Sequence, residues 1–132
     1  AKELNFWTKD EYEQFIQGFS SDEEMYRIIF QMLFWLGCRV GELLALTSED
    51  IDFENGTVNI SKAYYRRNQT DYITPPKTES SNRKITIPKF LVEEMKDFVD
   101  RQYGLTPEDR IFPITDRAIQ KKMKQKTEQA KL

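Results

Sequence analysis

One apolar segment, residues 22–37, constrains the fold more than any other part of the chain. Its apolar side chains recur at intervals of three and four residues, which is the spacing of one face of an α-helix. They are Met25, Ile28, Ile29, Met32, Leu33 and Leu36, and the aromatic residues Phe30, Phe34 and Trp35 widen this surface. We therefore expect a central buried helix. Gly37 is expected to end it, because glycine readily adopts the left-handed conformation common just after a helix.

Further helices are predicted on both sides of this segment. Thr8 with Glu11, and Ser21 with Glu24, fit the S/T-x-x-E capping box that opens a helix. The expected helices are 8–18, 22–37, 39–46, about 89–103 and about 116–130. The last of these is basic and carries few apolar residues, so we expect its packing to be weak or incomplete.

The stretch from about 57 to 88 has the texture of β-strands. The runs "TVNISKAYY", "DYITP" and "RKITIP" are separated by polar turns, and Asn55-Gly56 is a strong turn signal before the first of them. A three-stranded antiparallel sheet is the natural prediction. The expected fold is a mixed α+β class, mainly helical, with helices packed around this small sheet. A length of 132 residues fits one domain, residues 1–132.

The formal net charge of −2 hides an uneven distribution along the chain. Residues 1–61 carry 4 basic and 12 acidic side chains, whereas 62–89 carry 7 and 2. Residues 90–116 carry 3 and 7, and 117–132 carry 6 and 1. Two basic segments on an acidic body predict a localised face that binds anions. The competing interpretation is that these segments are simply solvated surface.

Several classes of function are excluded by composition. The chain has no histidine, so His-based metal sites and Ser-His or Cys-His nucleophilic pairs are ruled out. Its 5 glycines form no phosphate-binding loop of either common type. We therefore expect no metal and no cofactor. The single cysteine, Cys38, cannot form an internal disulfide, and it is interpreted as a packed small hydrophobic residue rather than a reactive thiol. No secretory signal and no apolar run of about 18 residues is found, so we expect a cytoplasmic protein without a membrane span.

Arg39 and Glu42 stand out because they lie inside the otherwise apolar run "FWLGCRVGELLAL". Burying a guanidinium group there is costly unless a negative group meets it. An ion pair between Arg39 and Glu42 is one interpretation, since the two residues are one helical turn apart. A ligand anion that Arg39 binds is the other.

The runs "LGCRVGELLALTSEDIDFENGTVNI" and "PPKTESSNRKITIP" resemble the catalytic domain of the tyrosine recombinases, or phage-type integrases, and "NFWTKDEYEQFI" resembles the start of that domain. The resemblance implies that the negative group is the scissile phosphate of DNA, and that Arg39 is the first catalytic arginine. By the same match Glu42 is a supporting acidic residue. Lys77 is the hairpin lysine that protonates the departing 5′ oxygen, a general-acid role.

The resemblance also implies a partner, double-stranded DNA, and a reaction. A tyrosine attacks the phosphodiester to form a 3′-phosphotyrosine, and the strand is then rejoined. Basic residues of the sheet are candidates for contacts with backbone phosphates, which position DNA without reading its sequence. They are Lys62, Arg66, Arg67, Arg83 and Lys84.

One departure from the family pattern shapes the expected activity. The His-x-x-Arg box, a later His or Trp and the nucleophilic tyrosine follow the segment where this sequence stops, and none of its 6 tyrosines inherits the nucleophile role. We therefore expect a truncated catalytic domain of a larger integrase that binds DNA weakly by itself and cleaves nothing. The resemblance implies that the full-length parent works as a homotetramer on DNA.

Two other classes of function remain open at this stage. A noncatalytic DNA-binding module is one, because "ELLALTSEDID" superficially resembles a helix-turn-helix. A helical protein-interaction domain with an incidental basic tail is the other.

Overall fold

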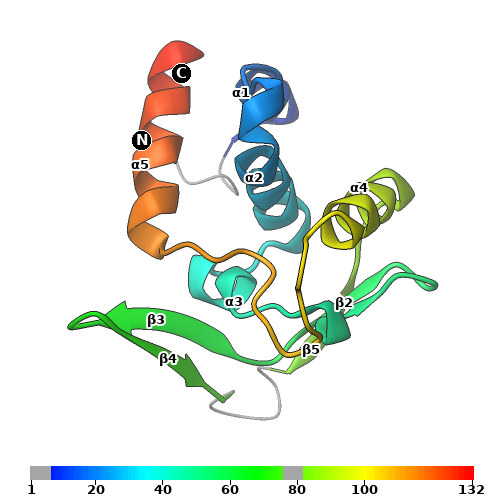
Figure 1. Cartoon of the computed structure of the whole chain (residues 1–132). Helices are drawn as coiled ribbons and strands as arrows, with labels where there is room; N and C mark the ends of the chain where they lie inside the picture. The colour runs from blue at the N-terminus through cyan, green and yellow to red at the C-terminus, as the bar shows by residue number, and fades with distance from the viewer. Residues whose placement is uncertain (1–6, 76–81) are drawn as a thin grey trace.

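The computed structural model describes residues 7–75 and 82–132, and in these ranges the helices lie to one side of the β-strands (Figure 1). Three helices come first, α1 (Lys9–Gln17), α2 (Glu24–Leu36) and α3 (Val40–Leu44). The strands follow, and then α4 (Lys89–Asp100) and α5 (Asp116–Gln129). The mixed α+β class, mainly helical, is confirmed. None of these helices is long and apolar enough to cross a lipid bilayer.

Helix α1 begins with a side-chain cap, whereas α2 follows a capped 3₁₀ turn. The Thr8 backbone N–H donates to the Glu11 carboxylate at 2.9 Å, and the Glu11 N–H donates to the Thr8 hydroxyl at 3.1 Å, which is the predicted capping box. The prediction for α2 is wrong by one residue. A 3₁₀ turn, Ser21–Glu23, precedes the helix, so it is the Ser20 N–H that donates to the Glu23 carboxylate, at 3.0 Å.

Helix α2 supplies the centre of the hydrophobic core. Gly37 ends it with a φ of 62° and donates its N–H to the Leu33 carbonyl, as glycine permits. The buried side chains of α2 are Ile28, Ile29, Phe30, Gln31, Met32, Leu33 and Leu36. Phenylalanine rings from α1 and from the α1–α2 connection pack on Phe30, with centroids 5.1 and 5.7 Å away. Burial of this apolar surface is what fixes α2 in the molecule.

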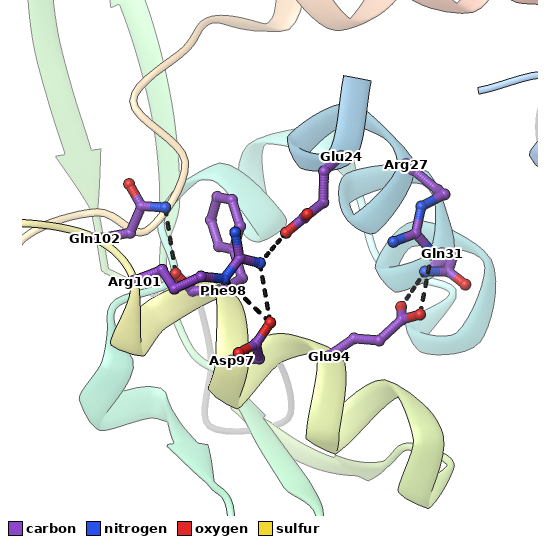
Figure 2. A network of polar contacts seen from close by, with 8 residues as sticks. All are labelled: Glu24, Arg27, Gln31, Glu94, Asp97, Phe98, Arg101 and Gln102. Carbon is purple, nitrogen blue, oxygen red and sulfur yellow. Dashed lines mark hydrogen bonds and ion pairs between the residues drawn. The ribbon is translucent and has the colours of Figure 1, made fainter. Parts of the chain in front are cut away.

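A rim of polar contacts joins α2 to α4 at the edge of this core (Figure 2). The Glu94 carboxylate accepts from the Gln31 amide at 2.6 Å and from the Arg27 guanidinium at 3.1 Å. Two turns beyond Glu94, the C-cap residue of α4, Arg101, donates to the carboxylates of Glu24 and Asp97. The buried Gln31 is therefore hydrogen-bonded, as buried polar groups generally are.

The strands form two separate antiparallel pairings. Three of them, β1 (Ile51–Asp52), β2 (Thr57–Ile60) and β5 (Arg83–Thr86), make a sheet in the order β1-β2-β5. Val58 in the central strand faces Ile51 on one side and Ile85 on the other. An antiparallel sheet of three strands is therefore present, but its strands differ from the predicted ones. β1 precedes residue 57, the run "DYITP" belongs to the other pairing, and the run 57–65 does not form one strand. That run breaks at Ser61 and Lys62, and the chain leaves the sheet.

After the break, β3 (Ala63–Arg67) and β4 (Thr70–Thr74) form a hairpin that packs against α3. Its two loop residues, Asn68 and Gln69, have φ of 51° and 61°. Positive φ at both positions is the pattern of the type I′ turn that fits a two-residue hairpin. Gly41 of α3 permits the contact, because a Cβ there would lie 2.9 Å from the Tyr64 carbonyl oxygen. The close approach to α3 gives a physical reason for the departure of β3 from the sheet.

Helix α5 stands beside α1 and α2 (Figure 1) and is attached largely through polar groups. The Glu23 carboxylate accepts from Lys122 at 3.0 Å and from Lys126 at 2.7 Å. At the far end of the helix, the Gln14 amide donates to the Ala130 carbonyl at 2.6 Å. Its fully buried apolar side chain is Ile119. Ion pairs thus compensate for the predicted shortage of apolar packing in α5.

Candidate nucleic-acid interface

Arg39 lies in the connection between α2 and α3, where it is the N-cap residue of α3 with extended backbone (φ −75°, ψ 153°). Its side chain is exposed to solvent, although Leu43 and Leu44 just beyond it are fully buried. Within the described ranges no residue forms a hydrogen bond or ion pair with its guanidinium group. The guanidinium is therefore open to solvent, because the N-cap position lies outside the packed turns of both helices.

The Glu42 carboxylate is bound to Arg83 rather than to Arg39. Two nitrogens of the Arg83 guanidinium donate to it at 3.2 and 3.3 Å, and the backbone N–H of Arg39 donates at 2.9 Å. Partial burial would raise the pKa of Glu42, but the hydrogen bonds from Arg83 and from the Arg39 backbone outweigh it, so that this pKa lies below its ordinary value. The interpretation of an Arg39–Glu42 ion pair is thus replaced by a Glu42–Arg83 pair.

Arg83 connects β5 to α3 through this contact and is itself half-buried. The hydrogen bonds that Arg83 donates to Glu42 raise the pKa of its guanidinium further. Lys84 is the next residue of β5, and successive strand residues point to opposite faces. It is exposed and lines a groove of about 400 Å³ together with Asp50, Asp52 and Asn59. Arg83 and Lys84 therefore point to opposite faces of the sheet.

The remaining cations of the strands differ in their partners. Lys62 binds Asp50 at 2.5 Å, and Arg66 binds Asp71 at 2.6 Å across the hairpin. Arg67 is exposed near the hairpin tip, and none of the described residues forms an ion pair with it. The structure therefore neutralises part of the basic segment internally. Lys77, between β4 and β5, lies outside the described residues.

A pocket of about 410 Å³ lies where the hairpin, α3 and the start of α5 meet. Its lining residues are Gly41, Tyr64, Tyr65, Arg66, Gln69, Thr115, Asp116 and Arg117. Sequence reasoning missed Arg117, although it belongs to the second basic segment, which was a usable signal. It also missed Arg110, which lies under Tyr64, and no pattern in the sequence marks that residue.

Two other expectations can be compared with the structure. The segment after α3 continues as a 3₁₀ turn, Ser48–Asp50, and then as β1, so it is not a helix-turn-helix. Burial raises the pKa of the Cys38 thiol to about 12, which is the opposite of what a reactive thiol requires. Across residues 7–75 and 82–132, no group of three or more acidic, cysteine or histidine side chains could hold a metal ion.

Comparison with known proteins gives a consistent result. Residues 5–132 match the model of the phage integrase family. The chain is 29% identical over 104 residues to the ICEBs1 integrase of Bacillus subtilis, a match that covers 79% of this chain and 28% of that protein. It is 36% identical over 97 residues to the prophage integrase IntR of Escherichia coli, covering 72% and 21%. The chain spans about a quarter of the length of the curated relatives it matches.

Solved structures show the same likeness. The Tn1549 transposon integrase in complex with transposon right end DNA superposes with a TM-score of 0.68 at 26% identity, covering 89% of this chain and 40% of that one. The XerA recombinase has the same fold, with a TM-score of 0.65 at 22% identity over 95% of this chain and 43% of that one.

Proposed function

The chain belongs to the phage integrase (tyrosine recombinase) family, and on that premise we propose that it is the DNA-binding part of a recombinase catalytic domain. The partner is double-stranded DNA, and the parent protein cleaves and rejoins DNA strands at specific sites. Its full-length form acts as a homotetramer on DNA. The observation that carries this proposal is the exposed Arg39 guanidinium, with which no described residue forms a hydrogen bond or ion pair.

Arg39 is proposed to bind the scissile phosphate. A guanidinium group is permanently charged and presents a planar fork that can contact two phosphate oxygens at once. Such a group stabilises the extra negative charge of a phosphoryl-transfer transition state. The α2–α3 connection supports this role because Glu42 holds the backbone at Arg39 without neutralising its side chain.

Glu42 and Arg83 are proposed to act together as a support for Arg39. An unpaired Glu42 carboxylate one turn from Arg39 would compete with the phosphate for that guanidinium. The two hydrogen bonds from Arg83 occupy the carboxylate and compensate its charge. Arg83 thus changes from a candidate phosphate contact into a positioning residue. Arg67 and Lys84, both exposed, are the preferred candidates for contacts with backbone phosphates, while Lys62 and Arg66 would have to exchange a carboxylate partner for DNA.

The reaction is proposed to follow the family's chemistry. A tyrosine oxygen attacks the phosphorus, a 3′-phosphotyrosine forms, and the 5′ oxygen leaves with a proton from Lys77. No tyrosine of this chain is assigned as the nucleophile. Because the chain spans about a quarter of its curated relatives, we place the nucleophile in another part of the parent protein. The chain alone is then expected to bind DNA weakly and to cleave none.

A DNA-binding titration tests the first half of the proposal. Fluorescence anisotropy of labelled duplex DNA is measured at several salt concentrations, because neutralised phosphates make the affinity fall steeply with salt. Arg39→Ala is expected to weaken binding and to reduce the salt slope by about one. The matched control is Arg101→Ala at the C-cap of α4, which removes the same charge from an arginine already paired with carboxylates. Equal losses in the two variants, or binding insensitive to salt, would contradict the proposal and favour a protein-interaction domain.

A covalent-trapping assay tests the second half. The full-length parent is incubated with a suicide DNA substrate whose cleaved end diffuses away, and the protein–DNA adduct is counted on a denaturing gel. We expect an adduct in the unmodified parent and a loss of about 100-fold or more in Arg39→Ala, the scale seen for a lost transition-state donor. Lys77→Ala should lower the rate as loss of a general acid does. Absence of any adduct in the unmodified parent rejects the recombinase and leaves a noncatalytic DNA-binding module.

A further inference from the structure

Arg110 lies at the centre of the chain segments that carry the proposed interface. It is half-buried in the connection between α4 and α5. Its Nη1 lies within hydrogen-bond distance of three backbone carbonyls, those of Leu44 at 3.1 Å, Phe112 at 3.0 Å and Ile114 at 3.2 Å. Leu44 is the last residue of α3, and carbonyls at a helix end lack partners within the helix. One nitrogen thereby joins α3 to the segment that leads into α5.

The same guanidinium also contacts the hairpin. Its central carbon lies 3.5 Å from the centroid of the Tyr64 ring, which is a close cation–π contact. The hydroxyl of Tyr64 donates to Asp71 at 2.7 Å, and Asp71 in turn accepts from Arg66 at 2.6 Å. These hydrogen bonds hold the pKa of the Asp71 carboxyl below its usual range. Arg110 is thus connected through Tyr64 to both strands of the hairpin.

We propose that Arg110 is a positioning residue that holds the β3–β4 hairpin and the start of α5 against α3. Through it, Arg67 on the hairpin and Arg117 at the start of α5 are kept in fixed places relative to Arg39. The inference rests on the proposed function, because it concerns the residue that fixes the positions of those cations relative to Arg39. Arg110 is not assigned as a DNA ligand, because Nη1 is used by backbone carbonyls and one face of the guanidinium is covered by Tyr64.

The chemistry of the contacts requires an arginine at this place. A lysine would keep the charge, but its ammonium is compact and strongly hydrated, and it lacks the planar group that stacks on a ring while donating from its edge. Arg110→Lys is therefore the informative variant. It retains the net charge of the chain, so long-range electrostatic attraction to DNA is preserved. It removes the planar group that contacts the three carbonyls and the Tyr64 ring.

Hydrogen–deuterium exchange on the DNA-free chain tests the coupling without reference to function. We expect Arg110→Lys to speed exchange roughly tenfold in residues 63–74 and 111–118, with little change in α2, because local opening is set by local contacts. Tyr64→Leu, which removes the stacked ring, should produce the same pattern. The control is Arg101→Lys at the C-cap of α4. Unchanged exchange in the hairpin, or equal acceleration in α2 and the hairpin, would overturn the proposal. A thermal melt of each variant detects the global destabilisation that would produce equal acceleration.

A double-mutant cycle on DNA binding tests the functional consequence. If Arg110 acts through the hairpin, Arg110→Lys should weaken binding severalfold in the unmodified chain and clearly less in an Arg67→Ala background, since neighbours in one network are not additive. Lys84→Ala, in the other sheet, serves as the additive control. Equal effects in all three backgrounds reject the coupling. Absence of DNA binding altogether rejects the proposed function, while the exchange result still decides whether Arg110 holds the hairpin.

Discussion

Two helices of this molecule, α2 and α5, stand side by side but are held by different forces (Figure 1). Helix α2 buries most of its length among apolar side chains, and its polar contacts with α4 lie at the edge of that core. Helix α5 has Ile119 as its fully buried apolar side chain, with Met123 partly buried, and it is also attached by its lysines to Glu23 and by its C-cap residue Ala130 to Gln14. Apolar burial responds weakly to pH, whereas an ion pair is lost when its carboxylate is protonated.

Because of this difference, the position of α2 depends little on solution conditions, whereas the attachment of α5 depends on the charge of Glu23. The core helix α2 leads directly into Arg39, so the proposed phosphate ligand is placed by contacts that solution conditions hardly change. Helix α5 belongs to the second basic segment, residues 117–132. Its Lys122 and Lys126, however, bind Glu23 and thereby attach the helix to the rest of the chain. Lys121 and Lys124, next to them on the helix, are exposed. A basic segment is therefore not equivalent to a DNA-binding surface.

The largest expected effect comes from opening the core around α2. Phe30 is fully buried and contacts the rings of Phe15 and Phe19. Phe30→Ala should lower the free energy of unfolding by about 3–5 kcal/mol, because it removes buried apolar area and leaves a cavity. Chemical denaturation followed by circular dichroism measures the loss. Trp35→Ala, on the exposed side of the same helix, is the control, and a similar loss in both variants would show that α2 is not held by its buried face.

The next effect concerns the pH dependence of the α5 attachment. Hydrogen bonds from Lys126, from the Ser20 backbone and from Lys122 lower the pKa of Glu23 to about 2, from an ordinary value of 4.5. A carboxylate with a lowered pKa stabilises the fold above its ordinary value and loses that contribution as the pH falls toward the folded-state pKa. We therefore expect faster amide exchange in α5 between about pH 4.5 and pH 2 than in α2, after correction for intrinsic rates.

Glu23→Gln is the matched control for this pH effect. The variant cannot ionise, so the fold should be weaker at neutral pH and the difference in unfolding free energy from the unmodified chain should shrink as the pH falls. Other carboxylates titrate in the same window in both proteins and cancel in the comparison. A difference that stays constant from pH 7 to pH 3 would contradict the assignment of the α5 attachment to Glu23.

Much of the fold follows from local pattern, and the departures have local causes. Helical spacing in residues 22–37 predicted α2, and Gly37 ends it as expected because no other residue takes a positive φ so readily. The run "TVNISKAYY" predicts one strand because strand-forming residues stand on both sides of Ser61 and Lys62. The structure breaks it there because β3 packs on α3, a long-range contact that propensity does not contain.

The site was less predictable than the fold for a similar reason. A motif located Arg39 and Glu42, but the partner of Glu42 is Arg83, which lies 41 residues away and arrives on another strand. Arg110 carries no sequence signal at all, since its role depends on three carbonyls and a ring brought together by folding. Which cations are free and which are paired is a property of tertiary structure.

A smaller effect is expected from removing one of the two lysines that bind Glu23. Lys126 is 5% exposed, with its ammonium 2.7 Å from the carboxylate and 4.9 Å from the Phe19 ring centroid. Lys126→Met keeps the length of the side chain and removes the charge, and it should cost about 1–2 kcal/mol of unfolding free energy because Lys122 remains as a partner. Lys124→Met, on the exposed face of α5, should cost little. Equal losses would mean that the helix is held by general charge rather than by Glu23.

The smallest effect is expected where an ion pair lies in water. Lys96 and Asp100 form a pair one turn apart on α4 at 3.0 Å, but their side chains are 60% and 61% exposed. Lys96→Met should change the unfolding free energy by only about 0.3–0.5 kcal/mol, and 1 M salt should abolish the difference, because solvent and counter-ions screen such pairs. Thermal melts of both proteins at low and high salt measure it. A loss as large as that of Lys126→Met would mean that burial does not decide the strength of these pairs, and the contrast between α2 and α5 would then need another explanation.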